Sequence, residues 1–141
     1  MKNIRKEFKG NWELVEWVAE LVNGKTVHPF GPDIVGKLTY DKKGNMAVQL
    51  MRKGRKPFRG DDPFQASPEE MLVAFQTFLS YCGTYEVDEE AKKVNHHITI
   101  SSIPNWTDQV QVRNYEFVED KLILSTDFIG PSRHKLTWRK I

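Results

Sequence analysis

The chain has 141 residues, of which 21 are basic and 19 acidic, so its formal net charge at pH 7 is only +2. This near balance argues against a protein that binds nucleic acid or membrane surfaces through its overall charge. No apolar stretch has the length and flanks of a signal peptide or a transmembrane span, and a single cysteine cannot form an intramolecular disulfide. We therefore expect one cytoplasmic domain covering residues 1–141.

Short β-prone runs separated by turn residues recur along the chain, a pattern typical of all-β sandwiches and barrels. The first run, residues 11–22, ends at Asn23-Gly24, a strong signal for a two-residue hairpin. Seven further runs follow at residues 34–41, 45–51, 81–87, 94–102, 108–118, 121–128 and 134–140. Short connections between them predict a meander of eight antiparallel strands.

One segment, residues 67–80, breaks this pattern and predicts a short helix. Ser67 is a good N-cap, Pro68 suits the first helical position, and Glu70 completes a capping box. Apolar residues then recur at helical spacing at Met71, Phe75, Phe78 and Leu79. We expect this apolar face to close one end of the sheet structure.

These elements predict an all-β fold, an eight-stranded antiparallel up-and-down barrel with one short α-helix between strands three and four. A sandwich is the other common solution, but it usually needs Greek-key connections that a meander lacks. The interior of an eight-stranded barrel is just wide enough for side chains or one small ligand. The fold therefore predicts a cavity.

The two ends of the chain carry a family pattern. Gly10-Asn11-Trp12 opens the first strand and Leu136-Thr137-Trp138-Arg139-Lys140 closes the last, which resembles the lipocalin (calycin) pattern. The stretches VHPFGPD, GKLTYDKKGNMAVQLM, YCGTYEV, VNHHITISSIPNW and QVRNYEF, in that order, resemble the bacterial lipocalin-like domain proteins.

The resemblance implies a container for a small ligand and names no ligand. It also implies that Trp12 and Trp138 plug one barrel end, where a basic residue of the last strand covers Trp12. Either Arg139 or Lys140 can take this place, and strand parity favours Lys140, which shares a face with Trp138.

Two adjacent histidines, His96 and His97, lie in the run at residues 94–102. Successive strand residues point to opposite faces, so His96 shares the apolar face of Val94, Ile98 and Ile100 and is expected inside, with His97 outside. Residues on opposite faces cannot chelate one metal, and His28 and His134 lie in or near loops. We expect no metal site and no cofactor.

In the next strand, residues 108–118, the alternation of apolar and polar residues does not by itself decide which face points inward. We place Gln111, Arg113, Tyr115 and Phe117 inside, because the aromatic rings need cover more than the valines of the opposite face do. A buried guanidinium needs a partner, and the acidic group of a ligand is one candidate. The sequence thus predicts a site for a small, mostly apolar molecule with a polar or anionic group. Its expected ligand-binding residues are Tyr40, Tyr85, His96, Gln111, Arg113 and Tyr115.

Two alternatives remain open. An isomerase, cyclase or decarboxylase could use His96 as general base, Arg113 as oxyanion stabiliser and Tyr40 or Tyr85 as acid. No catalytic-triad order, nucleophile elbow or nucleotide-binding motif supports an enzyme. A filled barrel acting as a protein-interaction module is the second alternative.

Two further features of the sequence are expected on the protein surface. The basic run at residues 52–59 could contact nucleic acid, but its loop context and the balanced net charge favour a solvated rim, so we expect no nucleic-acid partner. Trp17 lies on the strand face opposite Trp12 and Leu14. Strand parity therefore predicts that Trp17 covers an outer apolar patch, which makes a homodimer conceivable.

Overall fold

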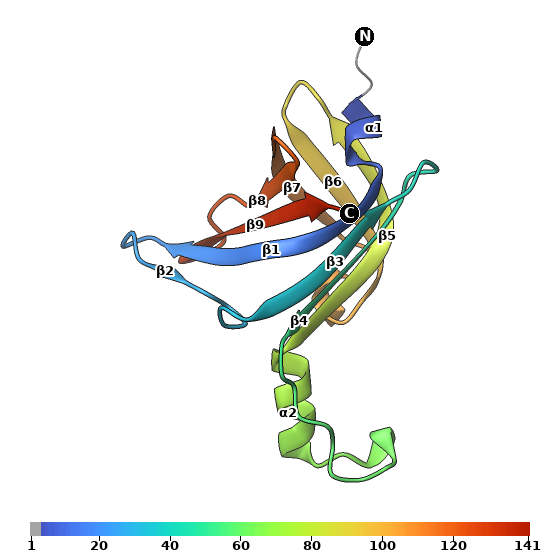
Figure 1. Ribbon diagram of the computed structural model, residues 1–141, viewed down its shortest axis with the longest axis vertical. Coiled ribbons are helices and arrows are strands. Elements are labelled where there is room, and N and C mark those ends of the chain that lie inside the picture. The colour runs from blue at the N-terminus through green and yellow to red at the C-terminus, as the bar shows by residue number, and fades with distance from the viewer. Residues whose placement is uncertain (1–3) are drawn as a thin grey trace.

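The computed structural model describes residues 4–141, and its strands form one antiparallel sheet that closes on itself (Figure 1). Strand β1 pairs with β9 from Trp12–Lys140 to Leu21–Ser132, which completes the ring. The predicted eight-stranded barrel with one short helix between its third and fourth strands is confirmed, and a two-residue strand, β2, pairs with β1 beside it. The strands are β1 (Gly10–Leu21), β2 (Thr26–Val27), β3 (Ile34–Tyr40), β4 (Asn45–Arg52), β5 (Phe78–Asp88), β6 (Lys93–Ser101), β7 (Val110–Val118), β8 (Lys121–Ser125) and β9 (Ser132–Lys140).

The predicted helix forms as α2 (Pro68–Gln76), and the capping box between Ser67 and Glu70 is present. The prediction that its apolar face closes the barrel is wrong. Figure 1 shows α2 projecting away from the strands, and Phe75 is 54% exposed. The expected apolar stripe is divided, because Phe78 and Leu79 already belong to β5. No helix within residues 4–141 has the length and apolar character needed to cross a lipid bilayer.

The opposite end of the barrel is closed by α1 (Ile4–Phe8), which the sequence analysis did not predict. Phe8 is fully buried there, and its ring centroid lies 4.9 Å from that of Tyr115 and 5.4 Å from that of Tyr40. Edge-to-face geometry between such rings is favourable. Aromatic packing around Phe8 therefore fills this end. Two single-turn 3₁₀ segments, η1 (Pro63–Gln65) and η2 (Pro104–Trp106), lie at connections elsewhere.

A β-bulge reverses the alternation of β1. The register with β9 shifts between Leu14 and Glu16, so residues after Val15 change face. Trp17 is consequently 7% exposed and points into the barrel, which contradicts its predicted outward position. Trp17 therefore does not cover an outer apolar patch, and the homodimer stays a prediction.

A second irregularity affects β6. Its register with β5 shifts between Cys82 and Gly83, so that Ile98 and Ile100 pair with consecutive residues of β5 and Thr99 is left over. Val94, His96 and Ile98 are buried, whereas Ile100 is 69% exposed. Parity thus assigns the first half of this strand correctly and fails beyond the bulge.

Candidate functional site

A cavity of about 230 Å³ occupies the half of the barrel away from α1. Ile129 lines it and is itself exposed, so the cavity reaches the surface near the loop between β8 and β9. Most of the wall is apolar or aromatic, formed by Trp17, Leu38, Val48, Leu50, Leu79, Tyr81, Trp106, Leu124, Ile129, Leu136 and Trp138. Five polar side chains interrupt this wall: His96, Gln111, Arg113, Thr126 and His134. A mainly apolar cavity with a few polar groups is the usual composition of a small-molecule site.

The structure brings together only some of the predicted ligand-binding residues. His96, Gln111 and Arg113 line the cavity, whereas Tyr40, Tyr85 and Tyr115 do not. The three tyrosines do point inward and are buried, but they lie at the closed end beside Phe8. Strand alternation gives the direction of a side chain and not its depth along the barrel, which is why it could not separate these tyrosines from the residues that line the cavity.

The tyrosines of the closed end have different polar surroundings. The Tyr85 hydroxyl donates to the carbonyl oxygen of Asp41 at 3.0 Å. The Tyr115 hydroxyl has no hydrogen-bond partner within residues 4–141. The Tyr40 hydroxyl is hydrogen-bonded to His96, which lines the cavity, so Tyr40 is linked to the cavity through this histidine.

Trp12 and Lys140 form the closure that the sequence resemblance implies. Lys140 Nζ lies 5.1 Å from the centroid of the Trp12 ring, a cation–π distance. The Trp12 indole donates to the carbonyl of Phe8 at 2.8 Å, which ties α1 to β1. Arg139 lies instead beside Glu13 and Asp120 on the outside. Trp138 is buried between this plug and the cavity, whose wall it joins.

His96 is held between two tyrosine hydroxyls. Its Nε2 lies 2.7 Å from the Tyr40 hydroxyl, and its Nδ1 lies 2.7 Å from the Tyr81 hydroxyl. Burial in the barrel, assisted by the nearby charge of Arg113, lowers the pKa of His96 to about 3. The imidazole is therefore neutral at physiological pH. Its neighbour His97 points outward, where it contacts Glu86 at 2.7 Å.

Arg113 contributes the only formal charge among the residues that line the cavity. Its Nη1 donates to Gln111 Oε1 at 3.3 Å and to the carbonyl of Val112 at 3.1 Å. Within residues 4–141, no carboxylate forms an ion pair with it. A partly buried guanidinium with neutral partners is suited to bind an oxygen atom of a ligand, and a negatively charged one most strongly.

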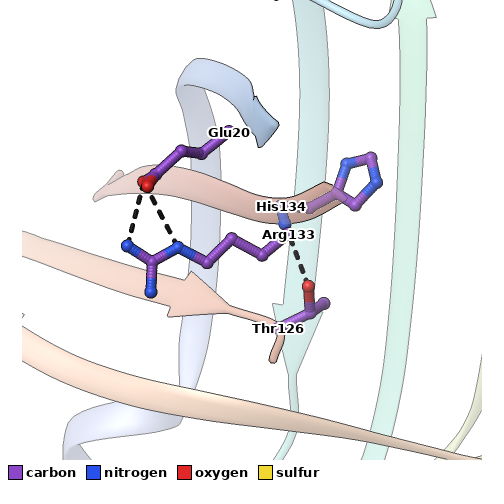
Figure 2. A network of polar contacts seen from close by, with 4 residues as sticks. All are labelled: Glu20, Thr126, Arg133 and His134. Atoms are coloured by element: carbon purple, nitrogen blue, oxygen red, sulfur yellow. Dashed lines mark hydrogen bonds and ion pairs between the residues drawn. The ribbon is translucent and has the colours of Figure 1, made fainter. Parts of the chain in front are cut away.

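His134 and Thr126 lie at the outer part of the cavity. The Thr126 hydroxyl accepts from the His134 backbone N–H at 2.9 Å. Figure 2 shows that the His134 ring and the Arg133 side chain extend from β9 in opposite directions, and that Arg133 reaches Glu20. The Trp17 indole donates to His134 Nδ1 at 3.0 Å, so the proton of the neutral ring is on Nε2. Burial, with a smaller effect of Arg113, lowers the pKa of His134.

Five cavity residues other than the aliphatic wall were not predicted as part of the site: Trp17, Tyr81, Trp106, Thr126 and His134. Alternation could have found three of them. Tyr81 shares a strand face with Tyr85, Thr126 extends the face of Leu124, and His134 extends the face of Leu136 and Trp138. Trp17 could not be found in this way, because the bulge at Val15 has no clear sequence signal.

The geometry also bears on the alternatives. Because a cavity is present, the filled-barrel alternative does not describe this structure. Both ring nitrogens of His96 are occupied by tyrosine hydroxyls, so the histidine has no free position for direct proton abstraction from a ligand. Within residues 4–141, no group of three His, Cys, Asp or Glu side chains is placed to hold a metal ion.

Comparison with known proteins gives a family match and a curated relative. A family model described as "Lipocalin-like domain" matches residues 9–141. The 4'-hydroxy-3'-methoxypropiophenone carrier protein ppsC of Aspergillus oryzae is 33% identical, over 68% of this chain and 96% of its own length. A solved structure of a redesigned β-barrel aligns with a TM-score of 0.49 at 10% identity, covering 100% of this chain and 97% of its own.

Proposed function

Because the chain belongs to the lipocalin-like domain family, we propose that its barrel binds a small, largely apolar molecule that bears a polar or anionic group. The single observation that carries this proposal is Arg113, a cavity-lining cation whose protein partners are neutral. The apolar wall supplies affinity without direction, and the guanidinium orients the polar end of the ligand. The role is non-covalent binding, with Arg113, Gln111 and His96 on the polar side.

The cavity volume limits the size of the ligand. An apolar cavity of about 150 Å³ holds a benzene molecule. A cavity of about 230 Å³ therefore accommodates one ring with short substituents, and larger groups must extend to the mouth beside Ile129. The relative in Aspergillus is named as a carrier of 4'-hydroxy-3'-methoxypropiophenone, a single-ring aryl ketone, which fits this size.

This ketone is a suitable first probe. We expect saturable binding by isothermal titration calorimetry with one site per chain and a Kd in the micromolar range, as is usual for a ligand of this size. Trp17, Trp106 and Trp138 line the cavity, so ligand entry should also change the intrinsic tryptophan fluorescence.

The matched control is Val48→Phe, which adds volume to the cavity wall. This variant should keep the fold, checked by circular dichroism, and bind the ketone at least tenfold more weakly. Equal binding by the wild type and Val48→Phe would place the ligand outside the cavity. Absence of binding by the wild type to a panel of single-ring ketones and carboxylates would contradict the proposed function.

A further inference from the structure

The hydrogen-bonded chain Tyr40–His96–Tyr81 runs from the closed end of the barrel to the cavity. Both links are 2.7 Å long, and both involve a ring nitrogen of His96. A neutral imidazole has one N–H donor and one acceptor nitrogen, so one tyrosine must donate to the ring and the other must accept from it. The two directions have different consequences for the cavity.

The surroundings of Tyr40 decide the direction. Tyr40 is 1% exposed, and its ring packs against the rings of Phe8 and Tyr85 at centroid distances of 5.4 and 4.6 Å. Its hydroxyl has one hydrogen-bond partner within residues 4–141, His96 Nε2. If Nε2 carried the proton, the Tyr40 O–H would be a buried donor without an acceptor, which is unfavourable. Tyr40 therefore donates to Nε2, and the imidazole proton lies on Nδ1.

We infer that Tyr81, which accepts from His96 Nδ1–H, presents its own hydroxyl proton to the cavity and selects ligands with an acceptor oxygen at that position. This inference rests on the proposed function and deepens it. Tyr81 lines the cavity and Tyr40 does not, so the free donor of the chain is the one that a ligand can reach. His96 acts as a positioning residue, because it acts on the ligand through Tyr81.

The rest of the cavity supports the same ligand class. Arg113 and the Nε2–H of His134 are donors, and the side-chain oxygen of Gln111 already accepts from Arg113. Burial raises the pKa of Tyr81, so its hydroxyl stays protonated at neutral pH. The polar groups are thus mainly donors, and they favour a carbonyl or carboxylate oxygen over a hydroxyl or amine that must itself donate.

The tautomer of His96 can be tested without any ligand. In the full-length chain, two-bond ¹H–¹⁵N correlation spectra of the histidine rings distinguish a protonated Nδ1 from a protonated Nε2. We expect His96 to be the Nδ1–H tautomer at pH 7 and His134 to be the Nε2–H tautomer. A spectrum showing His96 with the proton on Nε2 would overturn the inference.

The donor role of Tyr81 can be tested with a matched pair of ligands, propiophenone and propylbenzene, which differ chiefly by the ketone oxygen. In Tyr81→Phe, propiophenone should bind about tenfold more weakly, whereas propylbenzene should bind as it does to the wild type. Tyr85→Phe is the control, because the Tyr85 hydroxyl is bound to Asp41 at the closed end, and it should change neither affinity. An equal effect of Tyr81→Phe on both ligands, or no effect on either, would contradict the inference.

The two experiments separate this inference from the proposed function. If the wild type binds neither propiophenone nor propylbenzene, the proposed function loses support, and the histidine spectrum still decides the direction of the chain. If both ligands bind and Tyr81→Phe does not discriminate between them, the proposed function stands and the role given to Tyr81 falls.

Discussion

His96 shows how one residue carries both structural and functional constraints. It is 1% exposed, yet it is fully hydrogen-bonded through its two ring nitrogens, as a buried polar group needs to be. The low pKa that burial imposes keeps it neutral, so it acts as a fixed hydrogen-bond element and not as a charge. Its neutrality leaves Arg113 as the charged group of the cavity.

This buried histidine makes the stability of the protein depend on pH. The pKa of His96 is about 3 in the folded chain and about 6.5 in an unfolded one, so the unfolded chain binds more protons between these values. The contribution of neutral His96 to the free energy of unfolding should be fully present above pH 6.5. It should decrease as the pH falls toward 3, by up to about 1.4 kcal/mol per pH unit.

The comparison variant for this prediction is His96→Gln, which keeps a donor and an acceptor but does not titrate. Urea denaturation at pH 7 and pH 5 should show a loss of unfolding free energy that is larger in the wild type, by up to about 2 kcal/mol. The same loss in both proteins would show that His96 is not buried in the neutral form.

Arg113 yields a prediction about ligand charge. Arg113→Met keeps much of the length of the side chain and removes the guanidinium. Affinity for a single-ring carboxylate such as benzoate should fall by about 10- to 100-fold, because a hydrogen bond to a charged group is worth roughly 1.5–3 kcal/mol. Affinity for propylbenzene should change little, as measured by calorimetry. An equal change for both ligands would remove the anchoring role of Arg113.

At the scale of elements, α2 stands apart from the barrel. It packs against the start of β5, and Arg55 binds its C-terminal end through Thr77 and the carbonyl of Ala74. Its large apolar side chains are about half exposed, so they contribute little to the buried core. Local signals such as the capping box are sufficient to specify this helix, but they do not determine where the helix lies relative to the barrel.

Substitution on this helix should therefore have little effect on global stability. Phe75→Ser should change the free energy of unfolding by no more than about 0.5 kcal/mol, as is usual for exposed positions. Leu122→Ala, at a fully buried position of β8, should cost about 2–5 kcal/mol. Urea denaturation measures both, and a loss in Phe75→Ser as large as that in Leu122→Ala would show that α2 packs on the barrel.

The elements also show what the sequence can and cannot predict. Alternation and turn residues were enough to predict the strands and the closed meander. They failed where a bulge changed the parity, at Trp17 in β1 and Ile100 in β6. They also could not distinguish Tyr85, deep at the closed end, from Tyr81, which faces the cavity on the same strand. Depth depends on how strands stagger around the barrel, which is a property of the closed sheet.

The whole molecule is a barrel with one packed half and one hollow half. Aromatic residues around Phe8 fill the end beside α1, and Lys140 covers Trp12 there. The other half contains the cavity and the connections that surround its mouth. In this arrangement, the packed half provides stability while the hollow half remains available for a ligand.

Truncation of Phe8 tests the stabilising role of the packed half. Phe8→Ala should lower the free energy of unfolding by about 3–5 kcal/mol, because it removes a fully buried ring that packs against four others. Phe64→Ala is the control, since Phe64 is exposed and should contribute less than about 0.5 kcal/mol. Equal, small losses in both variants would show that α1 is not part of the stable core.

The central claim is that the hollow half holds a small molecule, and native mass spectrometry of gently purified protein tests it most directly. The account predicts a population of chains carrying one small single-ring compound, released on denaturation and absent from Val48→Phe prepared in the same way. Retention of the same compound by Val48→Phe, or a ligand-free wild type that also fails to take up added single-ring ketones and carboxylates, would contradict it.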